Sequence, residues 1–521
     1  MSSRTRAIVE TIYLVILALL IAVPIARILW WFYEAVPFWY ALDYNEGIVW
    51  KQMVEIVAGR GYAPIDGFPA IVFHYPPVFH LATAALAATR LDPLVSGRVV
   101  SLISTFGSML IIGDLARQMA GPRRPAITGV ATASAMIMFL LFESIHTWAP
   151  QMRVDAIACF FALAGLWCVT RSDRRPALIY LAAICFVLSV FSKQVSIVTA
   201  AASFGALLLL RPRRVIPAIA TTVILGGIVL AVLTWQTDGG VLRHLFLYNI
   251  NRFEVGRLLP NLIGATQSDH PLLLLGVIGY LVIFVEAWRQ RRRWSELDLT
   301  TAAMLLFVPI ATLSLVTSGK FGSSSSYYIQ WEAALAVFAA FAFAPLVGRA
   351  SAELAAGSTA RAAGWAAVPL LLTFWMFTHH DTRHIRSIEA MRVQDPEIVR
   401  LLEPVKGDII SDEMAILMRM HRDVVWEPSI FAELAHAGRW DERLVVERIR
   451  DHRIGAVVSD GDRGGQWFNE RYNPAVVAAM DEALPRKINI GGRVVHLPAE
   501  AVSSATAAPV SETPSIAAGR K

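Results

Sequence analysis

Residues 177–210 read ALIYLAAICFVLSVFSKQVSIVTAAASFGALLLL, an apolar stretch whose one charged residue is Lys193. A single helix through all of it would rise about 1.5 Å per residue and overshoot the roughly 30 Å hydrocarbon core of a bilayer. Because a lysine inside that core is costly, the pattern predicts two membrane spans joined by a tight turn at Lys193-Gln194. The charges elsewhere in the chain decide which side of the membrane this turn faces.

Similar apolar runs recur from residue 11 to residue 377, and the 521-residue chain is 55% hydrophobic and 17% charged, with a mean hydropathy of +0.51. This composition excludes a soluble domain of that size, and segments in lipid must be helical because lipid offers no hydrogen-bond partners. The first run has no small-residue cleavage site and ends in the aromatic segment 30–33, which predicts a retained span. The three cysteines lie in apolar runs and are predicted to be packing residues.

Basic residues lie at the ends of these runs and set the orientation. The net charge of +6 by itself would also suit a nucleic-acid-binding protein, but charges that cap apolar runs are a topology signal, so no nucleic-acid partner is predicted. If every Arg cluster is cytoplasmic, the amino terminus is inside and the number of spans is odd, about eleven. The clusters are Arg117/Arg123/Arg124, Arg171/Arg174/Arg175, Arg211/Arg213/Arg214, Arg289/Arg291/Arg292/Arg293 and Arg349/Arg361. The predicted spans are 8–33, 95–116, 125–145, 153–170, 177–192, 195–210, 215–235, 271–288, 300–317, 328–348 and 363–378.

This topology places the turn at Lys193 and the long loops on the outer side of the membrane. The stretch from Pro76 to Thr89 is too short for a crossing, and an extra crossing would place Arg123 outside. We therefore expect a helix at the membrane surface, with Pro77 in its first turn. The outer segments are 34–77, 143–155, 236–270, 318–326 and everything after about residue 379.

The expected fold is an all-α polytopic membrane domain, residues 1–380, with a small C-terminal α/β soluble module, residues 381–499. A tail at 500–521, rich in Ala, Ser, Thr and Pro, is predicted to be disordered. In the module, a helix start is predicted at Asp395-Pro396-Glu397, strands at 408–411 and 455–458, and a helix at 444–449.

Two carboxylates, Asp43 and Glu46, lie three residues apart in the first outer loop. Side chains at this spacing share one face of a helical turn and can point into a site at the membrane surface. The same spacing fits a helix start in which Asp43 is the N-cap and Glu46 completes a capping box. The spacing alone leaves both interpretations open.

Charged residues also lie at the outer ends of later spans. Arg153 and Asp155 stand at i and i+2, which does not bring two side chains onto one helix face, so each is predicted to find a partner elsewhere. Interfacial anchoring is the alternative. Lys193 is costly unless it reaches the membrane interface or meets an anion.

Polar and aromatic residues precede the next-to-last span, where Lys320, four serines, Tyr327 and Tyr328 follow one another closely. They form either the outer mouth of a site or a flexible linker. His74 and His80 in the first outer loop show no metal-ligand spacing, so no metal site is predicted.

Several of these motifs occur in a fixed order along residues 10–380. Together they resemble the GT-C superfamily of polyprenyl-phosphate-sugar-dependent glycosyltransferases, in the branch that includes protein O-mannosyltransferases and the aminoarabinose transferase of lipid A. The C-terminal module resembles the soluble domain of some bacterial members. The motifs are Asp43 with Glu46-Gly47, G-x-x-Y-x-P at 59–64, Tyr75-Pro76-Pro77, Arg153-x-Asp155, Ser192-Lys193-Gln194 and Tyr327-Tyr328.

The resemblance implies transfer of a sugar from a polyprenyl-phosphate donor to an envelope glycan, lipid or protein at the periplasmic face of the inner membrane, with inversion. It implies that Asp43 is the base, that Glu46 and Asp155 orient hydroxyls, and that Arg153 and Lys193 hold the donor phosphate. A divalent metal is not favoured, because Asn45 stands where relatives often carry a further carboxylate. The substrate contacts it implies are Tyr44, His74, Tyr75, Tyr327 and Tyr328.

Two other functions also need many spans. A lipid or sugar transporter or flippase would carry charges at mid-span and paired interrupted helices, whereas the charges here concentrate in outer loops. A sensor with a ligand-binding module would need fewer spans as an anchor.

Overall fold

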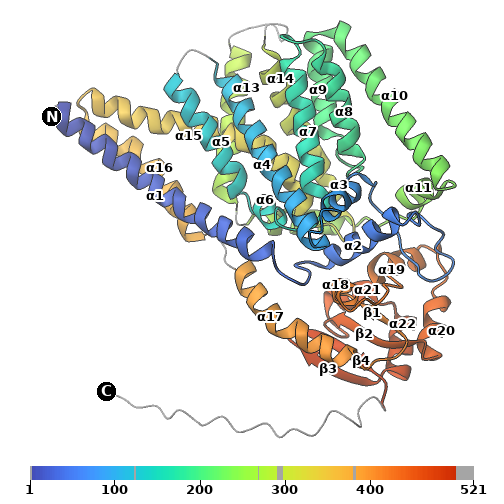
Figure 1. Cartoon of the computed structure of the whole chain (residues 1–521). Coiled ribbons are helices and arrows are strands. Elements are labelled where there is room, and N and C mark those ends of the chain that lie inside the picture. The colour runs from blue at the N-terminus through green and yellow to red at the C-terminus, as the bar shows by residue number, and fades with distance from the viewer. Residues whose placement is uncertain (1–2, 122–124, 268, 290–296, 380–382, 500–521) are drawn as a thin grey trace, which may run out of the picture.

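The computed structural model describes residues 3–121, 125–267, 269–289, 297–379 and 383–499. The predicted tail at 500–521 lies outside the described residues, as do Arg123, Arg124 and the cluster Arg291 to Arg293. Figure 1 shows a bundle of long helices on one side and a smaller module, built on a sheet, on the other. This arrangement confirms the predicted fold class.

Each predicted span coincides with a helix. Among the described residues, seven helical segments are long and apolar enough to cross a membrane, and α5, α8 and α9 are shorter apolar helices. Helix α16, at the position of the last predicted span, falls in neither group. The helices are α1 (Ser3–Ala35), α4 (Pro93–Ala120), α5 (Pro125–Leu141), α7 (Val154–Arg171), α8 (Leu178–Val190), α9 (Val198–Leu210), α10 (Pro212–Gln236), α13 (His270–Arg289), α14 (Leu299–Ser314), α15 (Ile329–Ala355) and α16 (Thr359–His379).

Helix α15 is the centre of the bundle. Its small residues between Ala333 and Ala340 are fully buried, which lets neighbouring helices approach closely. Gly279 of α13 lies so close that a Cβ there would be 1.9 Å from the carbonyl oxygen of Phe338. This packing of small residues, rather than a water-driven apolar core, holds the helices together in lipid.

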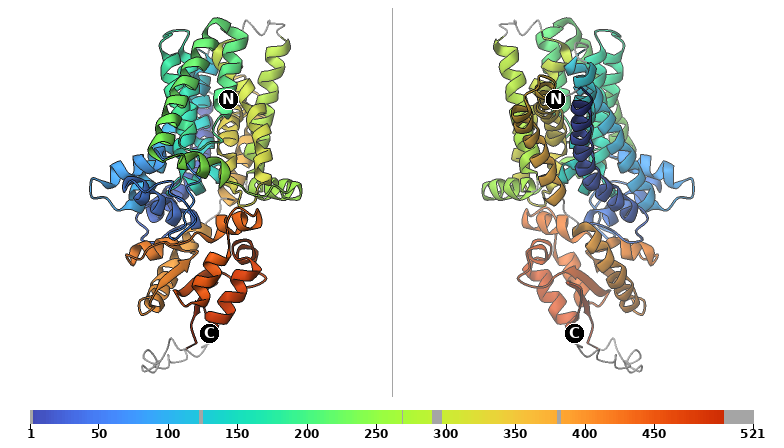
Figure 2. Two further views of the ribbon diagram at one scale, coloured as in Figure 1. Left: turned by 90° about the vertical axis from the view of Figure 1, so that its right-hand side faces the viewer. Right: turned by 90° about the vertical axis from the view of Figure 1, so that its left-hand side faces the viewer.

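Short helices lie at the end of the bundle that faces the module (Figure 2). Helix α3 (Val78–Ala87) has 10 residues and a length of about 15 Å at 1.5 Å per residue, which is too short to cross a bilayer. Pro77 was predicted in the first turn of this helix, and in the structure it is the N-cap, one residue before the helix begins. The others are α2 (Tyr44–Val57), α6 (Glu143–Trp148), α11 (Gly240–Leu242), η1 (Arg243–Leu247), α12 (Val255–Thr266), η3 (Leu315–Gly319) and η4 (Ser325–Tyr328).

The C-terminal module contains a four-stranded sheet in the order β1-β2-β4-β3, with β1 and β2 parallel and the other pairs antiparallel. The two predicted strands and the helix at 444–449 are present, but the hairpin of β3 and β4 was not predicted. The strands are β1 (Asp408–Ser411), β2 (Ile454–Asp460), β3 (Arg486–Ile490) and β4 (Arg493–Leu497). The helices are α17 (Arg383–Leu402), α18 (Met414–Arg419), α19 (Pro428–His436), α20 (Arg443–Arg450), α21 (Gln466–Arg471) and α22 (Pro474–Ala483).

The helix start predicted at Asp395 is wrong, because α17 begins at Arg383 and continues through Pro396. Ile388 and Met391, upstream of the proline, are buried against the helix bundle, and this packing holds an earlier turn in place. Asp395 is buried inside α17 and forms an ion pair with Arg493. A residue that looked like a cap is therefore a partner for a strand residue.

Candidate active site

A cavity of about 620 Å³ lies where the loops at one end of the bundle meet the module. The module is fastened to these loops by ion pairs between Lys51 and Asp423, at 2.6 Å, and between Arg252 and Glu433, at 2.7 Å. The backbone amide of Ser429 also donates to the Tyr44 hydroxyl. Both parts of the chain line the cavity, so its shape depends on their contact.

A chain of alternating charges forms the bundle side of the cavity. Arg153 Nη1 donates to Asp43 Oδ2 at 2.9 Å, and Arg153 Nε donates to Asp155 Oδ2 at 3.1 Å. Lys193 Nζ donates to the other oxygen of Asp155 at 2.5 Å. Two carboxylates and two cations are thereby joined, and of the four side chains Asp43 is the most exposed, at 26%.

The pairing of Arg153 with Asp155 was not expected at the i, i+2 spacing. Arg153 is the N-cap of α7 and has extended backbone dihedral angles, φ −137 and ψ 149. Its side chain therefore does not follow the side-chain directions of the helix, and the i, i+2 spacing rule does not apply to it. Asp155 lies in the first turn, where the positive end of the helix dipole favours a carboxylate. Each residue also has the predicted partner elsewhere, Asp43 for Arg153 and Lys193 for Asp155.

Aromatic rings cover both cations. The guanidinium carbon of Arg153 lies 4.3 Å from the ring centre of Trp148, and Lys193 Nζ lies 4.3 Å from that of Tyr327. Cation–π contacts of this kind stabilise a cation that has little access to water. The two cations are therefore held in fixed positions at the cavity wall.

Asp43 has a structural role as well as a place in the cavity. It is the N-cap of α2, with its Oδ2 accepting hydrogen bonds from the backbone and side-chain nitrogens of Asn45. Asp43 therefore caps α2 and also lies in the candidate site, so the two alternatives that the spacing left open do not exclude each other.

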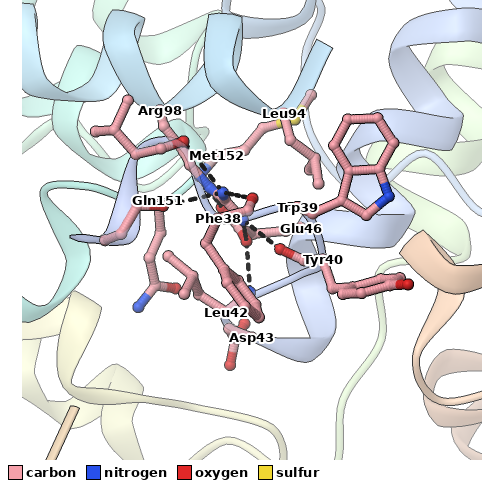
Figure 3. Close-up of polar contacts among 12 residues, drawn as sticks. Phe38, Trp39, Tyr40, Leu42, Asp43, Glu46, Leu94, Arg98, Gln151 and Met152 are labelled. Carbon is pink, nitrogen blue, oxygen red and sulfur yellow. Dashed lines mark hydrogen bonds and ion pairs between the residues drawn. The ribbon is translucent and has the colours of Figure 1, made fainter. Parts of the chain in front are cut away.

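Glu46 lies away from the cavity in a buried ion pair (Figure 3). It is fully buried and accepts from Arg98 Nε at 2.9 Å and Arg98 Nη2 at 2.7 Å. Its carboxylate also accepts from the backbone amides of Leu42, at 2.7 Å, and Met152, at 2.6 Å. This one carboxylate therefore ties the loop that carries Asp43 to the residue before Arg153.

Arg98 was not singled out in the sequence. Its guanidinium also donates to four backbone oxygens and so fixes the segment that follows α1. These are the oxygens of Ala35, Val36, Phe38 and Tyr40. An arginine in the first half of a predicted span was the signal that a buried partner had to exist.

Seven of the ten predicted site residues line the cavity. Asp155 lies behind them and touches the cavity only through Arg153 and Lys193. Tyr328 is buried at 1% exposure and, like Glu46, does not line the cavity. The seven are Asp43, Tyr44, His74, Tyr75, Arg153, Lys193 and Tyr327.

His74 is held neutral beside a carboxyl group of the module. Burial lowers the pKa of His74 to about 3, and its Nε2 lies 3.8 Å from Glu427 Oε1. Its backbone oxygen accepts from Gln194 Nε2 at 2.7 Å, which connects this loop to the turn that carries Lys193.

The module contributes carboxylates that the sequence interpretation missed. Asp412 and Glu413 follow β1, and Asp460 ends β2. Because β1 and β2 are parallel, their carboxyl ends meet at one edge of the sheet, where ligands commonly bind. The available signal was an acidic residue within two positions of the end of each predicted strand.

Glu413 should make stability depend on pH. Burial raises the pKa of Glu413 to about 8 from an ordinary 4.5, although Arg493 Nη2 donates to it at 3.1 Å. Between pH 4.5 and about 8 the folded state keeps a proton on Glu413 that the unfolded state releases. The stabilisation that this proton gives the folded state is complete below the lower pKa and is lost as the pH rises through the upper one. In Glu413→Gln, the thermal midpoint should therefore decrease less than in the wild type as the pH rises over this range. Parallel curves for wild type and variant would contradict this assignment.

Within the described residues, no group of three His, Cys, Asp or Glu side chains is arranged to hold a metal ion.

The fold is shared with solved membrane-protein structures. Apo ArnT from Cupriavidus metallidurans matches with a TM-score of 0.59 at 12% identity, over 92% of this chain and 97% of that one. The same protein bound to undecaprenyl phosphate matches with a TM-score of 0.56 at 13% identity, over 94% and 98%. The archaeal oligosaccharyltransferase AglB from Archaeoglobus fulgidus, in complex with an inhibitory peptide and a dolichol-phosphate, matches with a TM-score of 0.53 at 12% identity, over 94% and 74%.

These matches establish the class of structure: the chain has the GT-C fold. No family model matches the sequence, and no curated protein does.

Proposed function

We propose that the chain is a membrane glycosyltransferase that moves a sugar from a polyprenyl-phosphate donor to an envelope acceptor, with inversion. The observation that carries this proposal is the linked set of Asp43, Arg153 and Lys193 at the wall of a cavity at one end of a membrane bundle, with Asp155 joining the two cations from behind. The undecaprenyl phosphate and dolichol-phosphate bound by proteins of the same fold support this donor class.

The reaction needs a base for the acceptor hydroxyl and positive charge for the departing phosphate. Asp43 takes the proton while the acceptor oxygen bonds to the anomeric carbon. The bond from that carbon to the phosphate oxygen breaks, and its electron pair leaves with the polyprenyl phosphate. Arg153 and Lys193 hold the phosphate, and a single displacement inverts the anomeric centre.

Asp43 and the donor phosphate compete for the same cation. In the structure Asp43 is bonded to Arg153, and a bound phosphate would take over that partner and release the carboxylate to accept a proton. Asp155 stays between Arg153 and Lys193 and keeps both cations in place. Tyr44, His74, Tyr75 and Tyr327 are the proposed substrate contacts around them, whereas the positions of Glu46 and Tyr328 suit structural roles.

Removing either cation should weaken donor binding. Unit charges about 4 Å apart attract by roughly 4 kcal/mol at an effective dielectric of 20, so Arg153→Ala and Lys193→Ala should each lower the affinity for undecaprenyl phosphate by at least about ten-fold. Lys320→Ala is the matched control, because Lys320 lines the same cavity outside the network. Wild-type affinity in both variants would remove these residues from the donor site.

The proposed orientation places the module outside the cytoplasm and the bundle in the inner membrane. The ends of α4, α7 and α13 that carry Arg residues lie away from the module (Figure 1), in agreement with the positive-inside rule. Reporter fusions at Gly357 and Ala390, on either side of α16, should therefore differ in location. Equal cytoplasmic signals from both would overturn the orientation.

Mass spectrometry of a strain that lacks the gene tests the function in the cell. We expect one sugar to disappear from an envelope glycan, lipid or protein while its polyprenyl-phosphate donor accumulates. An unchanged envelope would argue against the proposal. A transporter or flippase would be distinguished by the purified chain, which would then release no polyprenyl phosphate.

A further inference from the structure

The cavity has two ends of different charge. The bundle side contributes one carboxylate, Asp43, and three cations. The module side contributes six carboxylates and two guanidinium groups. The carboxylates of the module are Asp412, Glu413, Glu427, Glu433, Asp460 and Glu470, and the guanidinium groups are those of Arg471 and Arg493.

Each arginine of the module is paired with two carboxyl groups. Arg471 Nη1 lies 2.7 Å from Asp460 and 2.9 Å from Asp412. Arg493 is paired with Asp395 and with Glu413. Arg153 and Lys193 are paired with carboxylates as well, so the difference lies in the number of acidic groups. Even with Glu413 and Glu427 protonated, four carboxylates face two guanidinium groups on the module side, and a phosphate there would meet more negative charge than positive.

Two buried carboxyl groups on this wall lack a partner for one oxygen. Glu427 is 2% exposed and Glu413 is 5% exposed, and neither Glu427 Oε2 nor Glu413 Oε1 has a hydrogen-bond partner among the described residues. Buried polar atoms are nearly always paired in folded proteins. Both residues line the cavity, and rotation of either side chain would present its unpaired oxygen, which is closed to solvent in this structure, to a ligand there.

These two groups suit a neutral ligand better than a cationic one. Burial raises the pKa of Glu427 well above its ordinary value, and it raises that of Glu413 as well. A protonated carboxyl both donates and accepts hydrogen bonds, as a sugar hydroxyl does. A cationic amine would instead require these groups to ionise.

An exposed indole ring completes the surface. Trp467 of α21 lines the cavity and is 54% exposed, and the guanidinium carbon of Arg471 lies 5.7 Å from its ring centre, so part of the indole remains open to a ligand. An aromatic plane next to donors and acceptors matches a sugar ring, which has apolar C–H faces and a polar rim.

We propose that the module-facing half of the cavity binds an uncharged, hydroxyl-rich glycan as the acceptor, an inference that rests on the function proposed above. Glu427 and Glu413 bond its hydroxyls, and Trp467 packs against a ring face. One hydroxyl of this glycan then faces Asp43 on the bundle side, where Arg153 and Lys193 hold the donor phosphate. A phosphorylated lipid is the acceptor class that this wall disfavours.

Binding to the full-length purified chain tests the proposal. The probes are three neutral hexasaccharides (gluco-, manno- and galacto-configured), the same three with a terminal phosphate added, and a Ser/Thr-rich peptide, all measured by saturation-transfer NMR. We expect at least one neutral hexasaccharide to bind and its phosphate form to bind at least about ten-fold more weakly. No binding by any neutral hexasaccharide, or tighter binding by the phosphate form or the peptide, would overturn the inference.

Variants locate the binding. Trp467→Ala and Glu427→Leu should each lower the affinity for the hexasaccharide by at least about ten-fold. Glu427→Gln keeps a hydrogen-bond donor and an acceptor and should retain most of the affinity. Trp288→Ala is the matched control, because Trp288 is 69% exposed at the far end of α13 and outside the cavity. Equal affinity of Trp467→Ala and the wild type for the hexasaccharide would show that Trp467 does not pack against the glycan.

Undecaprenyl phosphate, measured in parallel, separates this inference from the proposed function. If the wild-type chain binds undecaprenyl phosphate but no neutral glycan, only the acceptor assignment fails. If it binds a neutral glycan but no undecaprenyl phosphate, the donor assignment and the proposed function fail instead.

Discussion

Asp43→Asn should lower turnover by on the order of 10²-fold or more, the usual contribution of a general base, while the chain stays folded. Asparagine caps a helix about as well as aspartate, so the hydrogen bond from the Asn45 amide can persist. Arg153 keeps Asp155 as a partner in this variant. The loss should therefore appear in turnover and not in the thermal midpoint.

Asp92→Asn is the matched control for this experiment. Asp92 is also an N-cap, that of α4, and it is also paired with an arginine, Arg419, but it does not line the cavity. Its replacement should leave turnover near that of the wild type. If Asp43→Asn retained turnover as well, the base would have to be reassigned.

Glu46→Gln should destabilise the chain strongly. The substitution leaves Arg98 buried at 0% exposure without its carboxylate, and removing one partner of a buried ion pair costs about 3–5 kcal/mol. It also weakens the bonds that hold the Leu42 and Met152 amides. A thermal-shift measurement in detergent should show a large fall in the midpoint.

Glu482→Gln provides the comparison. Glu482 pairs with Arg450, and the two side chains are 65% and 50% exposed, so the loss should be about 1 kcal/mol or less. Similar midpoints for Glu46→Gln and Glu482→Gln would show that the buried pair does not stabilise the fold.

The membrane fold could be predicted because its signals are local. An apolar run of sufficient length has to be a helix in lipid, and the lysine in residues 177–210 marks the turn between α8 and α9. The start of α17 could not be predicted in the same way. Pro396 is a local signal, but the packing of Ile388 and Met391 against the bundle outweighs it.

The site was predictable on the bundle side and not on the module side. Asp43, Arg153 and Lys193 are charged residues beside apolar runs, so each had to find a partner or a ligand. Nothing local reports that Glu427 lies next to His74, 353 positions earlier in the chain. Glu46 was misplaced because its partner, Arg98, is 52 residues away.

Release of polyprenyl phosphate by the purified chain tests the central claim most directly. Full-length protein in proteoliposomes would be supplied with undecaprenyl-phosphate sugars and a neutral hexasaccharide, and free undecaprenyl phosphate would be quantified over time. The account predicts release by the wild type, near-absent release by Asp43→Asn and wild-type release by Asp92→Asn. Release that is the same with Asp43→Asn as with the wild type, or no release from any donor, would contradict it.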